Sequence, residues 1–332
     1  MKKEKGQIWV VVALFMLVLI ILFSLVADVG KVYLWQKKLE MAVDAAALAG
    51  GQEYALKFNS INAQDLAQDQ AEAVAVFYAG LNGADTNNVI VAFTDELNDI
   101  NTGTDGLDET LQVDATMEVP LMFTKMLGIL TKELSASAGV RIGSLAGMVG
   151  EGPAPWGPPP LYYQPGQRYM LKRGQGSGTK VGTGPSNYCA LALPGSTGAN
   201  DYRDNIIPGP PGFTGTLKVF DLIETEPGNM VGPTDQGVTG RLAMGADVVI
   251  VPIMDIRQNG RYQSPIYRFE AFRLDGDSLD KNQVVEVDGI MQKVGNGGVT
   301  AVYLENYVTS KGIMGGLCPS TVCRIKVIQL VR

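Results

Sequence analysis

The sequence QIWVVVALFMLVLIILFSLVA, Gln7–Ala27, runs without a break into DVGKVYLWQKKLEMAVDAAALAGG, Asp28–Gly51. The first of these two segments has 21 residues and carries no charge. An α-helix rises about 1.5 Å per residue, so about 20 apolar residues cross the ~30 Å hydrocarbon core of a bilayer. The sequence therefore predicts one membrane-spanning helix at 7–27, behind a short cytoplasmic tail at 1–6.

The charges on either side of this helix predict its direction in the membrane. Lys2, Lys3 and Lys5 precede the apolar segment, and Asp28 follows it at once. Lys31, Lys37 and Lys38 come one to three turns later and reduce this difference in charge. Basic residues next to a span are enriched on the cytoplasmic side. We therefore expect the N-terminus inside the cell and the C-terminus outside, with membrane lipid around a single-pass helix.

Two alternatives to a retained membrane helix are open. A cleaved secretory signal needs small residues at both recognition positions, and cleavage after Ala27 would place the bulky Leu25 at the other position. A buried core helix is the second alternative, but apolar side chains cover all sides of this segment, which a soluble domain seldom surrounds completely. The retained anchor is the preferred interpretation.

The helix is predicted to continue beyond the membrane. A largely apolar stripe with spacings of three and four residues follows Asp28, and Gly50–Gly51 supplies a stop signal. The stripe consists of Val29, Val32, Gln36, Leu39, Val43, Ala46 and Gly50. One helix of about 40–45 residues is expected, half in lipid and half outside.

A DVG segment and a DAAALAG segment follow the apolar run. Together with the N-terminal Gly6, they resemble the TadG-like N-terminal region of Flp (tight adherence) pilus-assembly proteins. The residues that carry this likeness best are Asp28, Gly30, Asp44, Ala45 and Ala46. The resemblance covers about the first 50 residues, and more loosely the first 145. It implies a bacterial cell membrane location, and partners among other pilus-assembly or pilin-like subunits, contacted through this helix.

Type IV pilins offer a related comparison. Gly6-Gln7 after lysines is similar to a prepilin-peptidase junction, but those pilins carry a glutamate at the position of Val11. We do not expect processing at Gly6.

Residues 28–145 are predicted to form a TadG-like helix and a small α+β domain. A second helix begins at Asn62, and strands are expected at 87–96, 111–120 and 133–144, with a short helix after Pro120. The second helix is expected to place its large apolar residues on one face, namely Leu66, Ala73, Phe77, Tyr78 and Leu81.

The remainder divides into a Gly/Pro-rich linker at 146–184 and a distal β domain at 185–332. Pro158–Pro160 stiffens the linker, which is expected to pack on its own domain. Turn residues separate the expected strands of the distal domain, which is typical of a mostly antiparallel sandwich or barrel. These strands are 186–193, 217–223, 247–254, 266–274, 284–292, 299–305 and 323–331. The fold class of the chain is α+β.

Composition excludes several function classes. The 332 residues contain no histidine, which removes Ser-His-Asp and Cys-His catalysis and histidine-ligated metal sites. The net charge is −7, and residues 52–118 hold 13 acidic side chains against the single Lys57. Such a surface repels phosphate backbones, so we expect no nucleic-acid partner. We also expect no catalytic residue and no cofactor.

A few weaker site candidates remain. No metal site is expected; Asp275, Asp277 and Asp280 in LDGDSLDKN are weak calcium candidates, because turn chemistry explains these residues without any site. Cys318 and Cys323 form either a disulfide across LCPSTVC or two free thiols. Cys189 is expected to be a small buried hydrophobe.

Three functions follow from these observations. The preferred one is a non-enzymatic, membrane-anchored component of a Tad/Flp-type pilus assembly or envelope machine. The alternative is an adhesin-like binding module on a membrane anchor. An anchored hydrolase is the third, and the missing histidine weighs against it.

Overall fold

A computed structural model describes residues 7–58, 63–94, 110–150, 153–177, 188–196, 198–256, 258, 260–287, 289–316 and 324–331. The chain forms two compact units. Unit 1 comprises Met1–Tyr54, Asn62–Arg141 and Gln329–Arg332, and unit 2 comprises Ala55–Ile61 and Ile142–Ile328. The predicted α+β class is confirmed, because a long apolar helix is followed by further helices and several antiparallel sheets.

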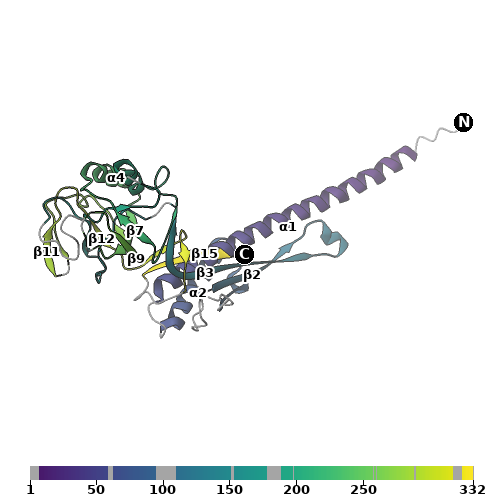
Figure 1. Ribbon diagram of the computed structural model, residues 1–332. Coiled ribbons are helices and arrows are strands. Elements are labelled where there is room, and N and C mark those ends of the chain that lie inside the picture. Colours follow the sequence, from purple (N-terminus) through teal and green to yellow (C-terminus); the bar gives the residue numbers. More distant parts are fainter. Residues whose placement is uncertain are drawn as a thin grey trace. The chain divides into compact units, whose positions relative to one another are not determined.

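Unit 1 contains the long helix and the antiparallel strands β1, β2 and β3, which lie in that order in their sheet (Figure 1). Its elements are α1 (Gln7–Lys57), α2 (Gln64–Leu81), η2 (Thr86–Asn88), β1 (Val89–Thr94), β2 (Thr110–Pro120), η3 (Thr124–Leu127) and the first part of β3 (Thr131–Val149). The expected order of two helices, two strands, a short helix and a strand is confirmed, with the short turn η2 added.

The predicted end of the long helix at Gly50–Gly51 is wrong, because α1 continues to Lys57. Both glycines are buried where α1 packs on α2. A Cβ atom on Gly50 would lie 2.9 Å from the Cβ of Ala75 and 3.0 Å from the carbonyl oxygen of Ala71. The glycine therefore permits close contact between two helices and does not terminate one of them.

The predicted apolar face of α2 is also wrong, although the helix itself is confirmed. The buried residues of α2 are Ala67, Ala71, Ala75 and Ala79, spaced four apart on one face. The larger apolar side chains that we expected inside are exposed, among them Leu66, Phe77, Tyr78 and Leu81. The close approach of α1 explains this choice, since only small side chains fit between the two helices.

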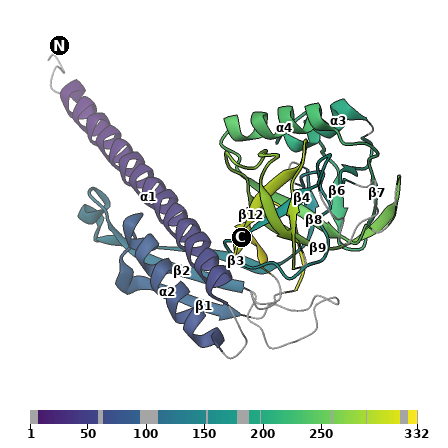
Figure 2. The ribbon, with the colours of Figure 1, turned by 90° about the vertical axis from the view of Figure 1, so that its left-hand side faces the viewer.

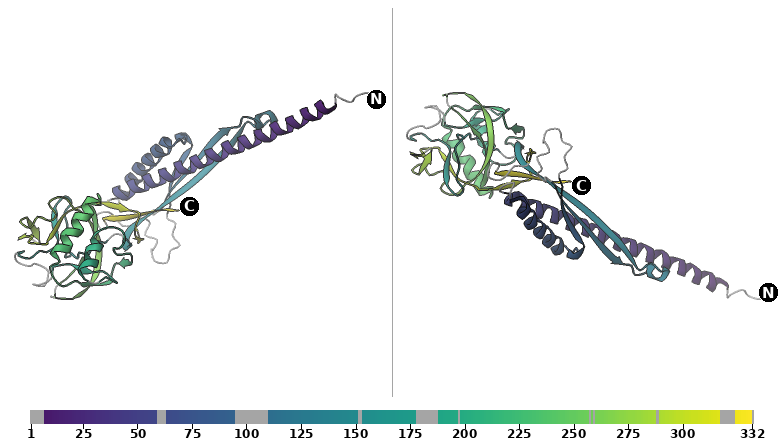
Figure 3. Two further views of the ribbon diagram at one scale, coloured as in Figure 1. Left: turned by 90° about the horizontal axis from the view of Figure 1, so that it is seen from above. Right: turned by 90° about the horizontal axis from the view of Figure 1, so that it is seen from below.

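Strands β2 and β3 form a long hairpin in continuous register, from Thr110 opposite Arg141 to Pro120 opposite Thr131. The inner face of β2 buries Leu111, Val113, Ala115 and Val119. The hairpin lies alongside α1, and its turn reaches the apolar half of that helix (Figure 3). This arrangement brings residues about 90 positions apart in the sequence into contact.

Unit 2 is built from short strands and two helices (Figure 2). Its main sheet has the order β4-β12-β9-β7-β5, with β8 also paired to β9, while β10 and β11 form a separate hairpin. The second part of β3 pairs with β6 and β14, and β13 runs parallel to β15. The bounds are β4 (Arg168–Lys172), β5 (Leu191–Ala192), β6 (Thr216–Lys218), β7 (Leu222–Thr225), β8 (Val248–Met254), β9 (Gln263–Arg273), β10 (Val284–Val287), β11 (Ile290–Lys293), β12 (Val299–Tyr303), β13 (Tyr307–Thr309), β14 (Ile313–Met314) and β15 (Ile325–Val331).

Two of the strands expected in this region are divided in the structure. The strand predicted at 217–223 becomes β6 and β7, because Phe220 between them takes a φ of 73° that no strand contains. The strand predicted at 284–292 becomes the β10–β11 hairpin, with Gly289 at a φ of 76°. The strands predicted around β8, β9, β12 and β15 are confirmed.

The helices α3 (Ala199–Ile206) and α4 (Val231–Ala243) lie in segments that the sequence predicted to be loops. Pro233 stands in the first turn of α4, where a missing N–H costs no helical hydrogen bond. Gly237 permits close packing, since a Cβ there would lie 2.8 Å from Cβ of Ile206. Pro233 and Gly237, which are typical turn residues, therefore lie within a helix, one in its first turn and the other at its contact with α3.

The Gly/Pro-rich segment packs within unit 2. Trp156 is fully buried, and its Nε1 donates a hydrogen bond of 2.7 Å to the hydroxyl of Tyr202. Pro153 forms an isolated bridge with Ile250 of β8, and β4 adds a strand to the main sheet. Residues 153–158 and 169–174 are therefore buried parts of unit 2.

Lys172 on β4 is a fully buried charged residue in the core of unit 2. Its Nζ donates hydrogen bonds of 2.6 Å to the carbonyl oxygens of Asn229 and Gly297. Burial lowers the pKa of Lys172 to about 7. The ammonium group links β4 to the segment before α4 and to the turn before β12.

Replacing Lys172 by methionine is expected to destabilise unit 2 by about 1–3 kcal/mol, because two buried carbonyl groups lose their donor. Chemical unfolding can be followed through the fluorescence of Trp156 in a Trp9→Phe, Trp35→Phe background. Lys218→Met serves as the control, since Lys218 is exposed; we expect a change within about 0.5 kcal/mol. Equal unfolding midpoints for the two variants would contradict the role given to Lys172.

Candidate functional site

The first half of α1 is apolar on all sides, and its side chains are exposed. In the described part of the chain, α1 is the one helix long and apolar enough to cross a membrane, with a mean hydropathy of 3.3 in its most apolar window. None of that window is buried in the protein. The exposed large residues are Trp9, Val10, Val11, Val12, Leu14, Phe15, Met16, Leu17, Val18, Ile20, Ile21, Leu22, Phe23, Leu25 and Val26. A soluble core helix would be covered, so this surface needs an apolar environment from outside the chain.

Asp28 follows this apolar surface and binds the turn of the β2–β3 hairpin. Its Oδ1 accepts a hydrogen bond of 2.9 Å from the backbone N–H of Met122. Its Oδ2 accepts bonds from the backbone N–H groups of Phe123 and Thr124, at 3.0 and 2.8 Å, and from the Thr124 hydroxyl at 3.1 Å. We call this set of four bonds the Asp28 clasp.

The Asp28 clasp places a carboxylate at the start of η3, where backbone N–H groups have no partner within the turn. The amide of Thr124 and the amides of Met122 and Phe123 lower the pKa of Asp28 to about 2, although burial acts in the opposite direction. The side chain is only 3% exposed. The carboxylate is therefore ionised at neutral pH and fully engaged.

Two further hydrogen bonds hold the hairpin along α1. The Nζ of Lys31 donates to the carbonyl oxygen of Pro120 at 2.5 Å, and the Nε2 of Gln36 donates to the carbonyl oxygen of Ser135 at 3.0 Å. Side chains one and two turns beyond Asp28 thus continue the clasp along β2 and β3. The outer part of α1 and the hairpin are fixed to each other at several points.

An apolar hollow lies between the first half of α1 and the turn of the hairpin. It has a volume of ≈ 680 Å³ and is lined by Ala13, Met16, Leu17, Ile20, Ile21, Ser24, Leu25, Phe123 and Thr124. The hydroxyl of Ser24 donates to the carbonyl oxygen of Ile20 at 2.6 Å, so this side chain adds little polarity to the wall. The hollow is suited to apolar groups.

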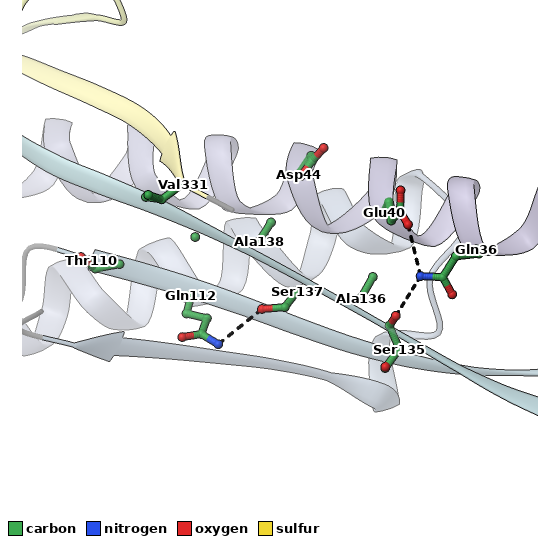
Figure 4. Close-up of a pocket in the computed structure, with 11 residues that line it drawn as sticks. Gln36, Glu40, Asp44, Thr110, Gln112, Ser135, Ala136, Ser137, Ala138 and Val331 are labelled. Atoms are coloured by element: carbon green, nitrogen blue, oxygen red, sulfur yellow. Dashed lines mark hydrogen bonds between the residues drawn. The ribbon is translucent and has the colours of Figure 1, made fainter.

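A polar groove lies farther along α1, on the side of the β2–β3 hairpin (Figure 4). It has a volume of ≈ 610 Å³ and is lined by Gln36, Glu40, Asp44, Thr110, Gln112, Ser135, Ala136, Ser137, Ala138, Gly139 and Val331. The Nε2 of Gln36 also donates to Glu40 at 3.3 Å, and Gln112 donates to Ser137 at 3.4 Å. The Nζ of Lys37 lies 2.6 Å from Oε2 of Glu40, so this carboxylate is already paired within the chain.

The residues of the N-terminal motif take different places in this arrangement. Asp28 forms the clasp, Asp44 lines the polar groove, and Ala46 is buried. Gly30 is exposed, and a Cβ added to it would meet no atom within 4 Å. Ala45 is half-buried. The structure thus brings Asp28 and the hairpin turn together but gives the motif no single site.

The carboxylates of two of the three calcium candidates, Asp275 and Asp280, accept hydrogen bonds within their own turns. Asp275 forms an ion pair with Arg168 and accepts hydrogen bonds from the N–H of Asp277 and the hydroxyl of Ser278. Asp280 accepts from the N–H of Asn282 at 2.9 Å. These are the bonds of turns. Within the described ranges, no group of three acidic or cysteine side chains is placed to hold a metal ion.

The structure describes one of the three cysteines, Cys189. Cys189 is buried in unit 2, as expected for a small apolar residue. Cys318 and Cys323 lie outside the described residues. The choice between a disulfide and two thiols therefore stays a prediction.

Sequence reasoning missed the partners of Asp28. The run PLMFTKMLGIL, residues 120–130, reads as a short helix between two strands. The sequence does contain an indication that this turn has a contact partner. It carries large apolar residues where hairpin turns usually carry Gly, Asn or Asp. That departure marks the turn as a surface with a partner.

The comparisons with known proteins agree with the N-terminal motif. Residues 6–53 match a family model described as putative Flp pilus-assembly TadE/G-like. Neither the curated proteins nor the solved structures gave a match to this chain. The matched range ends within α1 and contains Asp28, Gly30, Asp44, Ala45 and Ala46. The resemblance expected for the N-terminal region is therefore confirmed: residues 6–53 are similar to the TadE/G-like pilus-assembly family.

Proposed function

We propose that this protein is a non-enzymatic, membrane-anchored component of a Tad/Flp-type pilus assembly or related envelope machine. The match of residues 6–53 to the TadE/G-like family carries the proposal. It coincides with the helix whose apolar surface the chain itself leaves uncovered. The matched range, residues 6–53, includes the whole of this uncovered apolar surface, and together the two observations support a membrane location and a pilus-assembly system.

The proposed topology has the N-terminus inside and both units outside the cytoplasm. The lysines at positions 2, 3 and 5 support this direction by the positive-inside rule. The unbroken course of α1 through Ala27 and Asp28 supports a retained anchor over a signal that is cleaved there. The same helix would carry unit 1 directly from the bilayer surface.

The proposed role is structural, and α1 performs two tasks in it. Its first half is embedded in lipid, where it is open to helices of other pilus-assembly or pilin-like subunits. Its second half packs on α2 and on the hairpin through Leu39, Val43, Ala46 and Gly50.

The non-enzymatic character is supported by the sequence as a whole. Histidine, the commonest general base, is lacking throughout. Burial raises the pKa of Tyr202 and lowers that of Lys172 to about 7, and hydrogen bonds hold both side chains in the core of unit 2, Tyr202 to Trp156 and Lys172 to two carbonyl groups. Such arrangements serve packing.

Deletion of the gene, followed by complementation, tests the proposal. We expect loss of surface pili on deletion and their return with the intact chain. A Leu17→Arg chain should not restore them, because a charge at the centre of the span costs about 2.5–3.5 kcal/mol. Leu17→Ala is the matched control and should restore them. Normal pili in the deletion strain would overturn the proposal, and loss of adhesion alone would point to the adhesin-like alternative.

A further inference from the structure

The turn of the β2–β3 hairpin presents a cluster of large apolar side chains to the outside. We call residues Leu121–Leu130 the hairpin tip. Its exposed apolar residues are Met122 (67%), Phe123 (42%), Ile129 (53%) and Leu130 (57%). A hairpin turn in contact with water is normally polar, so this composition requires an apolar partner.

The hairpin tip lies beside the outer end of the apolar segment of α1 (Figure 3). The Asp28 clasp ties Met122, Phe123 and Thr124 to the first residue after that segment. Phe123 also lines the apolar hollow together with Ile20, which is about 12 Å along the helix from Asp28. Wherever the apolar segment of α1 enters a bilayer, the tip enters with it.

Six backbone N–H groups of the hairpin tip donate hydrogen bonds within the protein, as an apolar medium requires. The N–H groups of Met122, Phe123 and Thr124 donate to Asp28. Three more N–H groups donate within the tip: Leu121 to Leu130 at 3.0 Å, Gly128 to Lys125 at 3.1 Å, and Ile129 to Thr124 at 3.2 Å. Irregular backbone is tolerated at membrane depth only when its polar groups have partners. The clasp supplies half of these partners.

The charges around the hairpin tip fit a phospholipid surface. Lys125 and Lys132 are exposed, and no acidic residue occurs between Val119 and Lys132. The chain as a whole is acidic, with a net charge of −7. A basic, apolar patch on an acidic protein is attracted by anionic headgroups and buries its apolar residues among them.

From these observations, we propose that the hairpin tip is a second membrane-binding site, which inserts Met122, Phe123, Ile129 and Leu130 into the outer leaflet beside α1. The inference rests on the proposed function, in which α1 spans the membrane. It adds a lipid contact made by a segment about 95 residues away in sequence. Insertion of both α1 and the hairpin tip fixes the tilt and rotation of unit 1 on the membrane. Insertion of α1 alone would leave both free.

Depth-dependent fluorescence quenching tests this site. Ile129→Cys is labelled with an environment-sensitive fluorophore in the full chain, in a Cys318→Ser, Cys323→Ser background; Cys189 is buried and remains unlabelled. The purified protein is reconstituted in vesicles of phosphatidylcholine and phosphatidylglycerol, with and without lipids that carry a nitroxide on the acyl chain. The emission of the label is expected to shift to the blue and to be quenched by the nitroxide lipid.

Two control positions make the outcome decisive. Ile90→Cys lies on β1, and Ile90 is as exposed as the tip residues (66%), but it should show neither shift nor quenching. Leu17→Cys lies within the apolar segment of α1 and should be quenched. Quenching at position 17 with equal emission at positions 129 and 90 would overturn the hairpin-tip inference alone. Absence of quenching at position 17 would overturn the membrane anchor, and the inference with it.

Discussion

Replacing Asp28 by asparagine is expected to release the hairpin tip from α1. Asparagine keeps the size of the side chain, but it has one acceptor oxygen and an NH2 group in place of the second. The carboxylate accepts four hydrogen bonds, three of them on Oδ2. The NH2 group would face N–H donors at one of these positions and could accept nothing, so the clasp cannot form in its native geometry.

Hydrogen exchange of the hairpin tip measures this release. Exchange of the amides of Met122, Phe123 and Thr124 is expected to rise on the order of tenfold or more in the Asp28→Asn chain, because bonds to a charged acceptor are lost. Asp44→Asn on the same helix is the matched control, since Asp44 lines the polar groove and makes none of these bonds. Unchanged exchange at the tip in Asp28→Asn would show that the clasp does not hold it.

The contact between Asp28 and the hairpin tip is expected to weaken at low pH. The pKa of Asp28 is lowered to about 2 in the folded chain, against about 3.9 for an unperturbed aspartate. A lowered folded pKa stabilises the folded state above the unfolded pKa, and this stabilisation is lost as the pH falls toward 2. Exchange at the hairpin tip, corrected for the intrinsic effect of pH, should therefore rise between about pH 4 and pH 2 in the natural sequence. The Asp28→Asn chain should lack that rise, and a rise of equal size there would contradict the assignment.

The second large effect is expected at the contact between α1 and α2. Gly50→Ala is predicted to add about 1–3 kcal/mol of strain to unit 1, and after the gain in helix propensity to destabilise it by up to about 2 kcal/mol, since the new Cβ would lie 2.9–3.0 Å from Ala75, Ala71 and Leu111. The backbones must move apart, because two of these neighbours are an alanine Cβ and a carbonyl oxygen, neither of which can rotate away. The gain in helix propensity, about 1 kcal/mol, is smaller than this strain at the upper end of the range.

Gly30→Ala is the matched control for Gly50→Ala. Both glycines lie inside α1, but a Cβ at Gly30 meets no atom within 4 Å. Gly30→Ala should therefore be neutral or stabilise the helix by about 0.5–1 kcal/mol. Hydrogen exchange of the buried face of α2 provides the readout. Equal protection of α2 in both variants would show that Gly50 is not needed for close packing.

The parts of the fold that the sequence predicts correctly are those with strong local patterns. An uncharged run of 21 residues and the alternating residues of β2 leave little choice of structure. The order of elements in unit 1 and the family of the N-terminal region follow from such patterns as well.

The wrong predictions concern residues whose place in the fold is decided by a tertiary contact and not by the local sequence. Gly50 has the signature of a helix end, but it lies inside α1 because Ala71 and Ala75 approach it. Gly237 likewise lies inside α4, where Ile206 packs against it. These contacts join segments that are more than 20 residues apart, and no local pattern reports them. For the same reason the Asp28 clasp was not predicted, although Asp28 itself was singled out.

Accessibility labelling from outside the cell tests the proposed membrane topology most directly. Single cysteines are placed at position 2 (Lys2→Cys) and at position 90 (Ile90→Cys) in the Cys318→Ser, Cys323→Ser background, and cells stripped of their wall are treated with a membrane-impermeant maleimide. A retained anchor with its N-terminus inside predicts labelling at position 90 in intact cells, and labelling at position 2 only after lysis. Labelling at position 2 in intact cells, protection at position 90, or a membrane-bound chain that lacks position 2 would contradict it.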